Sequence, residues 1–284
     1  MLFADDSQLY ITCDHYSDVQ LDIEACIDEI KEWMKENLLV LNDSKTELIH
    51  FKSKFRKDKD DRIPSIRVGE SQVESVSVVR NLGVYLDEAG LMEANLKKIC
   101  KSASFGLWKI GKIRKLLDCT LTERLVHAFI TSRIDYCNAL LSGLSVNQLK
   151  PLQTVQNSAA RMISRTNIRE HISPVLYELH WLPVYQRTKF KILITAFKCI
   201  YGMAPLYLSE LITPRFPKRS LRPKPVTLAP KRTNNLKWYG PSAFSVSAPE
   251  LWNALPPSLR LITEFNVFKS QLKTHLFREH YYGF

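Results

Sequence analysis

The hydrophobic periodicity of this chain changes near residue 90, and that change limits the possible folds more than any other feature. From Leu91 to about Arg165, apolar side chains recur at the three- or four-residue spacing of helices that bury one face. Before Leu91 the apolar runs are short, some of them alternate, and turn-forming residues separate them. The sequence therefore predicts an α+β fold whose second part is mainly helical. We expect helices near 91–116, 120–141 and 145–165, with Thr120 and Ser145 as N-caps.

The first 90 residues are expected to form small strands around one amphipathic helix. Apolar residues from Val19 to Leu38 follow the helical period, and Ser17 with Gln20 forms a capping-box pattern before them. Gly83 lies inside an apolar run, where a glycine often marks a close approach of the backbone. The other expected elements are a strand at 8–12, a strand, turn and strand across 38–51, a hairpin turning at Gly69-Glu70, and a strand at 78–87.

The C-terminal part combines helices with a basic, proline-rich stretch. Residues 213–237 carry eight basic residues, five prolines and no acidic residue, which predicts an extended linker that buries little apolar surface. The last 47 residues hold compact apolar clusters, and we expect them to pack on the body as a helical cap. Within 174–212 we expect helix boundaries at Pro174, Pro183 and Pro205, and core positions for Trp181 and Trp252.

Charge is unevenly distributed along the chain. Residues 1–50 contain three Lys against twelve Asp or Glu, a net charge of −9, whereas the other 234 residues carry a net charge of +20. Lys and Arg displace counterions from phosphates, so a long basic body suits a polyanionic partner such as nucleic acid. A basic surface that serves only solubility explains the same composition, so charge alone leaves both interpretations open.

Cysteine usage and the apolar segments favour an intracellular protein. The six cysteines are scattered and lack the short, paired spacings of a zinc site, a distribution typical of a reducing compartment. The N-terminus reaches two acidic residues without the basic region of a signal peptide. The most apolar stretch, "ILITAFKCIYGMAPLYL", is interrupted by Lys198 and Pro205 and is too short to span a bilayer. We therefore expect no membrane association and a location in the nucleus or the cytoplasm.

The strongest functional signal is a set of motifs in a fixed order. The first, "FADD" (3–6), is weak alone, because two carboxylates occur in solvated turns by chance. After it come "WMKENLLVLNDSKTELIHF" (33–51), "RNLGVYLD" (80–87) and a basic helical region. In this order they resemble the reverse transcriptase of LINE-type (non-LTR) retrotransposons, at its aromatic-Ala-Asp-Asp box, the next palm segment and the primer-grip hairpin. Two later segments, "LHWLPVYQRTKFKI" (179–192) and "APELWNALPPSLR" (248–260), are similar to regions downstream of the polymerase core in CR1-like and jockey-like elements.

The resemblance covers nearly the whole chain and implies a C-terminal fragment of that enzyme. Its fold would be a partial palm, with short antiparallel strands and one helix, followed by a mainly helical thumb and C-terminal region. The implied parts are a distal palm fragment with the primer-grip hairpin at 1–90, a helical thumb at 91–170, a helical post-thumb region at 171–212, the basic linker at 213–237 and the C-terminal cap at 238–284.

The resemblance also implies a metal-dependent nucleotidyl transfer that uses an RNA template, a DNA primer or target DNA, and deoxynucleoside triphosphates. In such transfers two Mg²⁺ ions about 3.5–4 Å apart hold the attacking and leaving oxygens, and carboxylates supply the hard oxygen ligands. Asp5 would be the direct metal ligand and Asp6 an accessory one. The family uses a third carboxylate well upstream of this box, and only four residues precede Asp5 here.

Other residues take implied roles in the same way. Lys45 would approach the triphosphate and assist the leaving pyrophosphate, although a lysine after a turn is also simply exposed. Leu82 and Gly83 would form the primer grip, because a glycine lets the backbone approach the primer strand; a bulge in a small sheet is the alternative. The basic helix would contact the duplex backbone through Lys97, Lys98, Lys101, Lys109, Lys112, Arg114 and Lys115.

These implications lead to one interpretation and two alternatives. The 284 residues alone are expected to be inactive and not to hold Mg²⁺ stably, because Asp5 and Asp6 lack the opposing carboxylate. The first alternative is a non-catalytic module that binds nucleic acid with little sequence preference. The second is a transposon relic with no role, whose core would be poorly formed.

Overall fold

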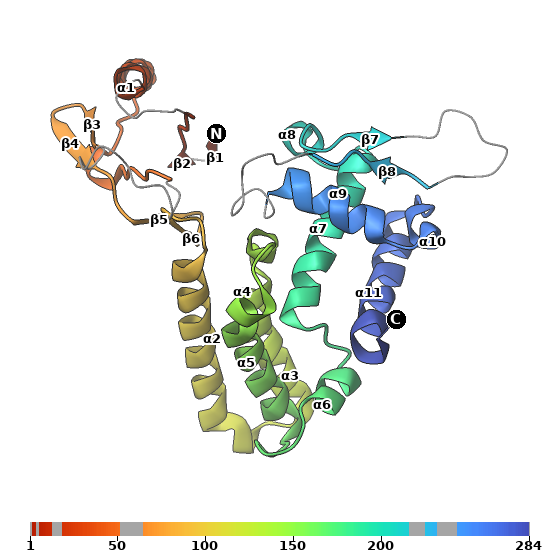
Figure 1. The fold of residues 1–284 in the computed structure, drawn as a ribbon. Helices are drawn as coiled ribbons and strands as arrows, with labels where there is room; N and C mark the ends of the chain where they lie inside the picture. The colour runs from red at the N-terminus through yellow and green to blue at the C-terminus, as the bar shows by residue number, and fades with distance from the viewer. Residues whose placement is uncertain are drawn as a thin grey trace. The chain divides into compact units, whose positions relative to one another are not determined.

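A computed structural model of the chain describes residues 2–3, 6–12, 19–51, 65–215, 225–231 and 243–283. The described residues form an α+β structure that is mainly helical, with a few short antiparallel strand pairs. The chain divides into two compact units, Met1–Ala94 and Asn95–Phe284 (Figure 1). The predicted α+β fold class is therefore confirmed.

The small unit contains one long helix and three two-stranded antiparallel pairs in its described part: β1 with β2, β3 with β4, and β5 with β6. Its elements are β1 (Leu2–Phe3), β2 (Asp6–Ser7), α1 (Gln20–Glu36), the 3₁₀ turn η2 (Asp43–Lys45), β3 (Ser65–Val68), β4 (Ser71–Glu74), β5 (Val78–Asn81) and β6 (Val84–Asp87).

The helix α1 packs on the β3–β4 hairpin through a small apolar core. Ile27 of α1 is buried together with Ile66 and Val68 of β3. Around this core, the Lys31 ammonium lies 2.9 Å from the Asp43 carboxylate, which ties α1 to η2. Arg67 of β3 also contacts α1. Its backbone N–H donates to the Glu24 carboxylate at 2.9 Å, and its guanidinium donates to the Asp28 carboxylate at 3.0 Å. These ion pairs are partly exposed, so they orient the helix on the hairpin but stabilise the packing only modestly.

The hairpin predicted at Gly69-Glu70 is confirmed, and two other predictions for this unit are wrong. Val68 pairs with Ser71, so Gly69 and Glu70 form a two-residue turn, in which Gly69 has a φ of +62°. The predicted strand at 8–12 is irregular, because its apolar side chains are all exposed and so give the alternation no buried face to stabilise. The segment 38–51 contains the turn η2 and one isolated bridge, from Leu48 to Ser75, in place of two strands.

The helix predicted after Ser17 is confirmed as α1, and its predicted capping box stays a prediction. Ser17 lies outside the described residues. Val19 occupies the N-cap position without a side-chain hydrogen bond, and the Gln20 amide bonds the Glu24 carboxylate one turn further on. Gln20 therefore makes one side-chain hydrogen bond within the helix.

The large unit begins within α2 and is mainly helical. In its described part, strands occur only as one short pair, β7 with β8. Its elements are α2 (Glu93–Ile113), η3 (Arg114–Leu116), α3 (Cys119–Val126), the π turn η4 (His127–Thr131), α4 (Ser132–Asp135), η5 (Asn138–Leu141), α5 (Val146–Ser164), α6 (Ser173–Glu178), α7 (Val184–Ile200), α8 (Leu206–Ser209), β7 (Pro214–Arg215), β8 (Thr227–Leu228), α9 (Phe244–Ala254), α10 (Pro257–Arg260) and α11 (Phe265–Tyr282).

Helix boundaries in this unit follow local capping chemistry. Ser145 caps α5 as predicted, in a capping box with Gln148 in which each side chain bonds the other residue's backbone N–H. The predicted cap Thr120 is wrong: Asp118 caps α3, and its carboxylate accepts from the Leu121 backbone N–H at 2.7 Å. The predicted helix boundaries are confirmed, because α6, α7 and α8 begin at Pro174, Pro183 and Pro205 or next to them.

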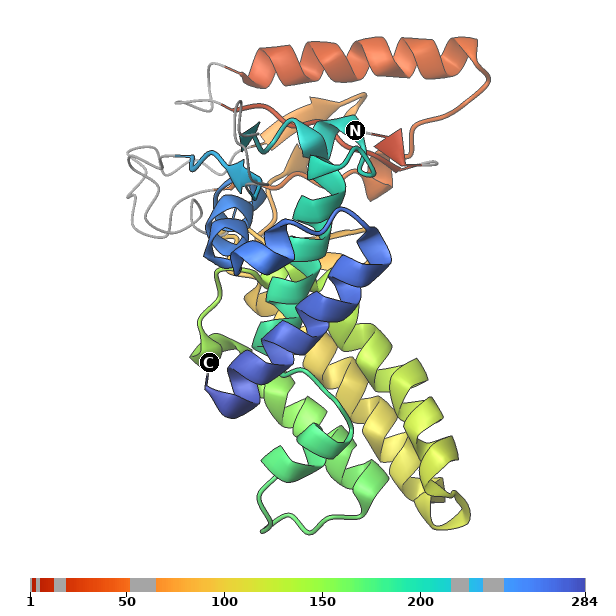
Figure 2. The ribbon, with the colours of Figure 1, turned by 90° about the vertical axis from the view of Figure 1, so that its right-hand side faces the viewer.

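The C-terminal helices pack around α7, which lies against α9 and α11 (Figures 1 and 2). The rings of Phe197, Trp252 and Phe268 are fully buried there, with centroids 4.4 to 6.4 Å apart. Trp181 is also buried, so the predicted core positions of both tryptophans are confirmed. The side chains that these helices share make the region one apolar core.

Part of the predicted basic linker belongs to this core. In the described segment 225–231, Val226 and Leu228 are buried. The Trp252 indole N–H donates to the Val226 carbonyl at 3.0 Å, and the Asn253 amide bonds both the N–H and the carbonyl of Leu228. The linker prediction is therefore wrong for these residues, because distant side chains hold their backbone; residues 216–224 and 232–237 of that stretch lie outside the described residues.

Candidate nucleic-acid interface

One face of α2 carries most of the lysines that the sequence singled out. Because successive residues of an α-helix are rotated by about 100°, these side chains fall within roughly a third of the helix circumference. All of them are exposed, and Glu93, in the first turn, is the one acidic residue of α2. We call this surface the basic face of α2, defined by Lys97, Lys98, Lys101, Phe105, Trp108, Lys109 and Lys112.

The opposite face of α2 holds the helix in the unit. Of the apolar stripe that the spacing predicts, Leu96, Ala103, Leu107 and Ile110 are buried and Ile99 is half-buried, whereas Ile113 at the end of the helix is exposed. A Cβ added to Gly106 would lie 3.4 Å from the Phe129 carbonyl oxygen, an ordinary contact distance, so this side of α2 lies against the π turn η4. The basic face is therefore presented to solvent by a helix whose other side is fixed.

Two aromatic side chains lie among the lysines and were not among the predicted site residues. Phe105 and Trp108 are each 55% exposed, and their rings stack with centroids 5.7 Å apart and planes inclined by 16°. The ammonium of Lys109 lies 4.6 Å from the Phe105 centroid, and that of Lys112 lies 3.8 Å from the Trp108 centroid. Their spacing could have revealed them, because positions 105 and 108 fall outside the apolar stripe of the helix.

Arg114 is placed differently from the lysines, and its predicted role is not supported by its contacts. Its guanidinium donates to the carbonyls of Met162 (2.7 Å) and Ile163 (3.0 Å) in the last turn of α5. A third bond, of 2.7 Å, goes to the Leu117 carbonyl. The last carbonyls of a helix lack partners within the helix and carry a partial negative charge, so an arginine stabilises them. Arg114 therefore joins the end of α2 to the end of α5.

Leu82 and Gly83, the predicted primer grip, form the turn of the β5–β6 hairpin. Asn81 pairs with Val84, which leaves these two residues as the whole loop. Their φ values are +45° and +82°, and positive φ at both central positions is the mark of a type I′ turn. The predicted continuous strand at 78–87 is therefore two strands, because Gly83 permits the left-handed backbone at the turn.

Lys45 lies at the end of η2 with its side chain exposed. Asn42 builds this turn: its carbonyl accepts from the Lys45 N–H at 3.1 Å, and its side chain accepts from the Ser44 hydroxyl at 2.7 Å. Among the described contacts, no hydrogen bond or ion pair links Lys45 with Asp6. The structure thus places Lys45 on a defined turn without joining it to the predicted carboxylates.

The predicted metal site is described only in part. Asp6 is exposed on β2, opposite Phe3 of β1. Asp5, the implied direct ligand, lies outside the described residues. In the described part of the chain, no group of three or more His, Cys, Asp or Glu side chains could hold a metal ion. The described residues therefore do not make up the Mg²⁺ site that the resemblance implies.

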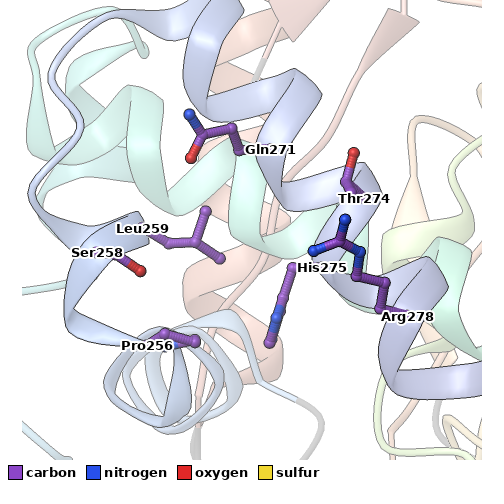
Figure 3. A pocket seen from close by; sticks show the side chains of 7 residues that line it. All are labelled: Pro256, Ser258, Leu259, Gln271, Thr274, His275 and Arg278. Carbon is purple, nitrogen blue, oxygen red and sulfur yellow. The ribbon is translucent and has the colours of Figure 1, made fainter. Parts of the chain in front are cut away.

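A hollow of about 290 Å³ lies between α11 and the segment around α10 (Figure 3). Arg278 contributes a permanent positive charge, and no residue of the lining is acidic, so the hollow suits a small anion better than a cation. None of the residues that line it was predicted as a site residue. They are Pro256, Ser258, Leu259, Gln271, Thr274, His275 and Arg278.

Comparison of the chain with protein-family models, curated proteins and solved structures found no match. Among the described residues, no helix has the length and apolar character needed to cross a membrane.

Proposed function

We propose that this chain is part of an RNA-directed DNA polymerase of a non-LTR retrotransposon and that the basic face of α2 binds nucleic acid in it. The order of the "FADD", "KTE" and "NLGVYLD" motifs supports the family, with distal palm residues in the small unit and a helical thumb in the large unit. The observation that carries the binding function is the basic face itself, where lysines gather on one side of a fixed helix. Phosphates are the ligands that such a surface suits best, because their charge is regular and repeated.

The β5–β6 hairpin supports the same proposal. Its turn is tight, and the Gly83 position has no side chain that would keep a strand away from the backbone. Leu82 is 39% exposed beside it, so an apolar group is available to lie against a sugar. In this proposal the turn contacts the primer strand, and α2 contacts the backbone of the template–primer duplex.

The 284 residues by themselves are proposed to be catalytically inactive. The resemblance implies a third carboxylate upstream of Asp5, and a two-metal transfer cannot be held in register by Asp5 and Asp6 alone. Primer extension on an RNA template, with Mg²⁺ and deoxynucleoside triphosphates, tests this. We expect no extension. Mg²⁺-dependent extension that disappears in Asp5→Ala would contradict the proposal.

A non-catalytic, sequence-tolerant binding module is the second candidate, and the basic face of α2 favours it independently of the motifs. Six exposed lysines, including Lys115 after the helix, can each neutralise one phosphate. Counterion release then predicts that log K for duplex DNA falls with log salt at a slope of about −5. Affinity should depend little on sequence, because contacts to phosphates carry no base information.

The two candidates both predict nucleic-acid binding, and they differ in whether the intact protein also extends a primer. Adding the upstream region of the open reading frame to the chain should create extension activity in the first candidate and none in the second. The relic interpretation predicts neither binding nor a cooperative unfolding transition. An aggregated chain that binds no nucleic acid at low salt would therefore contradict both candidates.

A further inference from the structure

The two aromatic rings of the basic face of α2 are largely exposed to solvent. Phe105 and Trp108 point away from the buried side of the helix and are each 55% exposed. Single exposed apolar residues are common on proteins, but a stacked pair that lies between lysines is a specific arrangement. A ligand for this surface should therefore offer flat rings as well as negative charge.

Each ring already receives a cation from the next turn of the helix. Lys109 follows Phe105 by four residues and Lys112 follows Trp108 by four, and both ammonium groups lie over the rings. Lysine side chains on a surface change rotamer within nanoseconds, so a flat ligand group can replace the ammonium over a ring. The displaced ammonium then remains close enough to pair with a phosphate attached to that group.

We infer that Phe105 and Trp108 are a stacking platform for unpaired bases, so that the basic face of α2 prefers single-stranded nucleic acid to duplex. The inference rests on the proposed nucleic-acid binding of this face: the lysines contact the backbone of a duplex, as proposed above, and the rings add affinity for an unpaired strand. A base stacks on an aromatic side chain whatever its sequence, because every base has a π-face. In a duplex the bases cover one another, so a duplex contacts the lysines but gains nothing from the rings.

The test compares three probes of equal length with fluorescence anisotropy: single-stranded oligothymidylate, a DNA duplex, and an abasic deoxyribose-phosphate strand. Three variants of the full chain are compared with the wild type. Phe105→Leu with Trp108→Leu removes the rings, and Lys109→Gln with Lys112→Gln removes the charges. Trp33→Leu is the matched control, because Trp33 is 58% exposed on α1 and has Glu29 and Glu32 close by in the sequence. All replaced side chains are exposed, and circular dichroism checks that each variant is folded.

We expect the ring variant to lose about tenfold or more in affinity for oligothymidylate, and less than about twofold for the duplex and the abasic strand. The lysine variant should weaken all three probes, and Trp33→Leu should change none. The inference is overturned if the ring variant binds oligothymidylate as the wild type does, or if the wild type binds the abasic strand equally well. Polyglutamate bound as tightly as oligothymidylate would also overturn it, in favour of an acidic protein partner. If the wild type binds none of these probes at low salt, the proposed nucleic-acid binding fails, and the inference fails with it.

Discussion

Replacing Asn253 by alanine removes both hydrogen bonds that hold the backbone of Leu228 in the core of the large unit. The Asn253 amide oxygen accepts from the Leu228 N–H at 3.0 Å, and its amide nitrogen donates to the Leu228 carbonyl at 2.8 Å. Leu228 lies opposite Pro214 of β7, while the neighbouring Ala229 N–H bonds the Thr213 carbonyl. In this antiparallel pattern the N–H and carbonyl of Leu228 point away from β7, so Asn253 acts in place of a further strand.

The cost of Asn253→Ala follows from the burial of those two groups. Leu228 is 1% exposed, so water does not easily replace the lost partners. An unpaired buried donor or acceptor costs about 1–3 kcal/mol, so the loss of both predicts a decrease in the free energy of unfolding of about 2–6 kcal/mol. Asn253→Asp keeps the acceptor but sets a carboxylate oxygen against the Leu228 carbonyl, so we expect it to be no more stable than the alanine variant.

Urea denaturation followed by tryptophan fluorescence measures this difference, because Trp252 is buried next to Asn253. Asn266→Ala is the matched control: Asn266 is exposed on α11, so we expect a change of less than about 0.5 kcal/mol. If Asn253→Ala is as stable as that control, the side chain does not act as a strand partner, and residues 226–228 are the linker that their composition predicts.

Three further predictions concern single contacts. Arg114→Gln should lower the free energy of unfolding by about 1–3 kcal/mol in urea denaturation, because its partner carbonyls lose their charged donor. The affinity of this variant for duplex DNA should stay within about twofold of the wild type. A larger loss of affinity would indicate that Arg114 contacts nucleic acid, as the resemblance implies. Glu24 accepts hydrogen bonds from the Gln20 side chain and the Arg67 N–H, which hold its pKa below the ordinary value of 4.5. The small unit should therefore lose stability as the pH falls below 4.5 and through the folded-state pKa, and unfolding of Glu24→Gln across acid pH should show a weaker dependence. An unchanged pH dependence would contradict this. Burial raises the pKa of Tyr281 from 10.0 to about 12, so stability should fall as the pH rises from 10 towards 12, and alkaline unfolding of Tyr281→Phe should show a smaller fall. Equal alkaline profiles of the two proteins would rule that contribution out.

Local features could be predicted from the sequence because their causes are local. The apolar period after residue 90 predicted that this region is helical, although the helix expected at 120–141 ends at Asp135 and a separate 3₁₀ turn, η5, follows it. Ser145 with Gln148 caps α5 as the capping-box pattern predicts. The cap of α3 shows the limit of this reasoning. Asp118 and Thr120 can both cap a helix, and the backbone conformation that selects Asp118 cannot be read from residue type.

Long-range contacts caused most of the errors. Residues 226–228 lie in a stretch whose composition is that of a linker, and the side chains that bury them come about 25 residues later. The alternating run at 8–12 predicts a strand, but alternation stabilises a strand only where one face is buried. The composition and hydrophobic periodicity of a segment do not identify the distant residues that pack against it.

In the candidate interface, too, some features follow from local periodicity and others depend on distant contacts. The exposure of Lys97 and Lys101 follows from the helical period, since they lie opposite the apolar stripe. Arg114 continues the same basic run, but its carbonyl partners belong to α5, 48 and 49 residues away. Phe105 and Trp108 were missed because large apolar residues are expected in the core, although their positions place them among the lysines.

The salt dependence of duplex DNA binding tests the central claim most directly. Between about 50 and 200 mM salt, we expect the wild type to show a slope of about −5 in log K against log salt, and Lys97→Glu with Lys98→Glu and Lys101→Glu to reduce its magnitude by about 3. The matched control has the same change of net charge on exposed lysines elsewhere in the large unit, Lys150→Glu with Lys269→Glu and Lys273→Glu, and should keep the wild-type slope. A wild type that does not bind at low salt, or a basic-face variant that matches the wild type, would contradict the account.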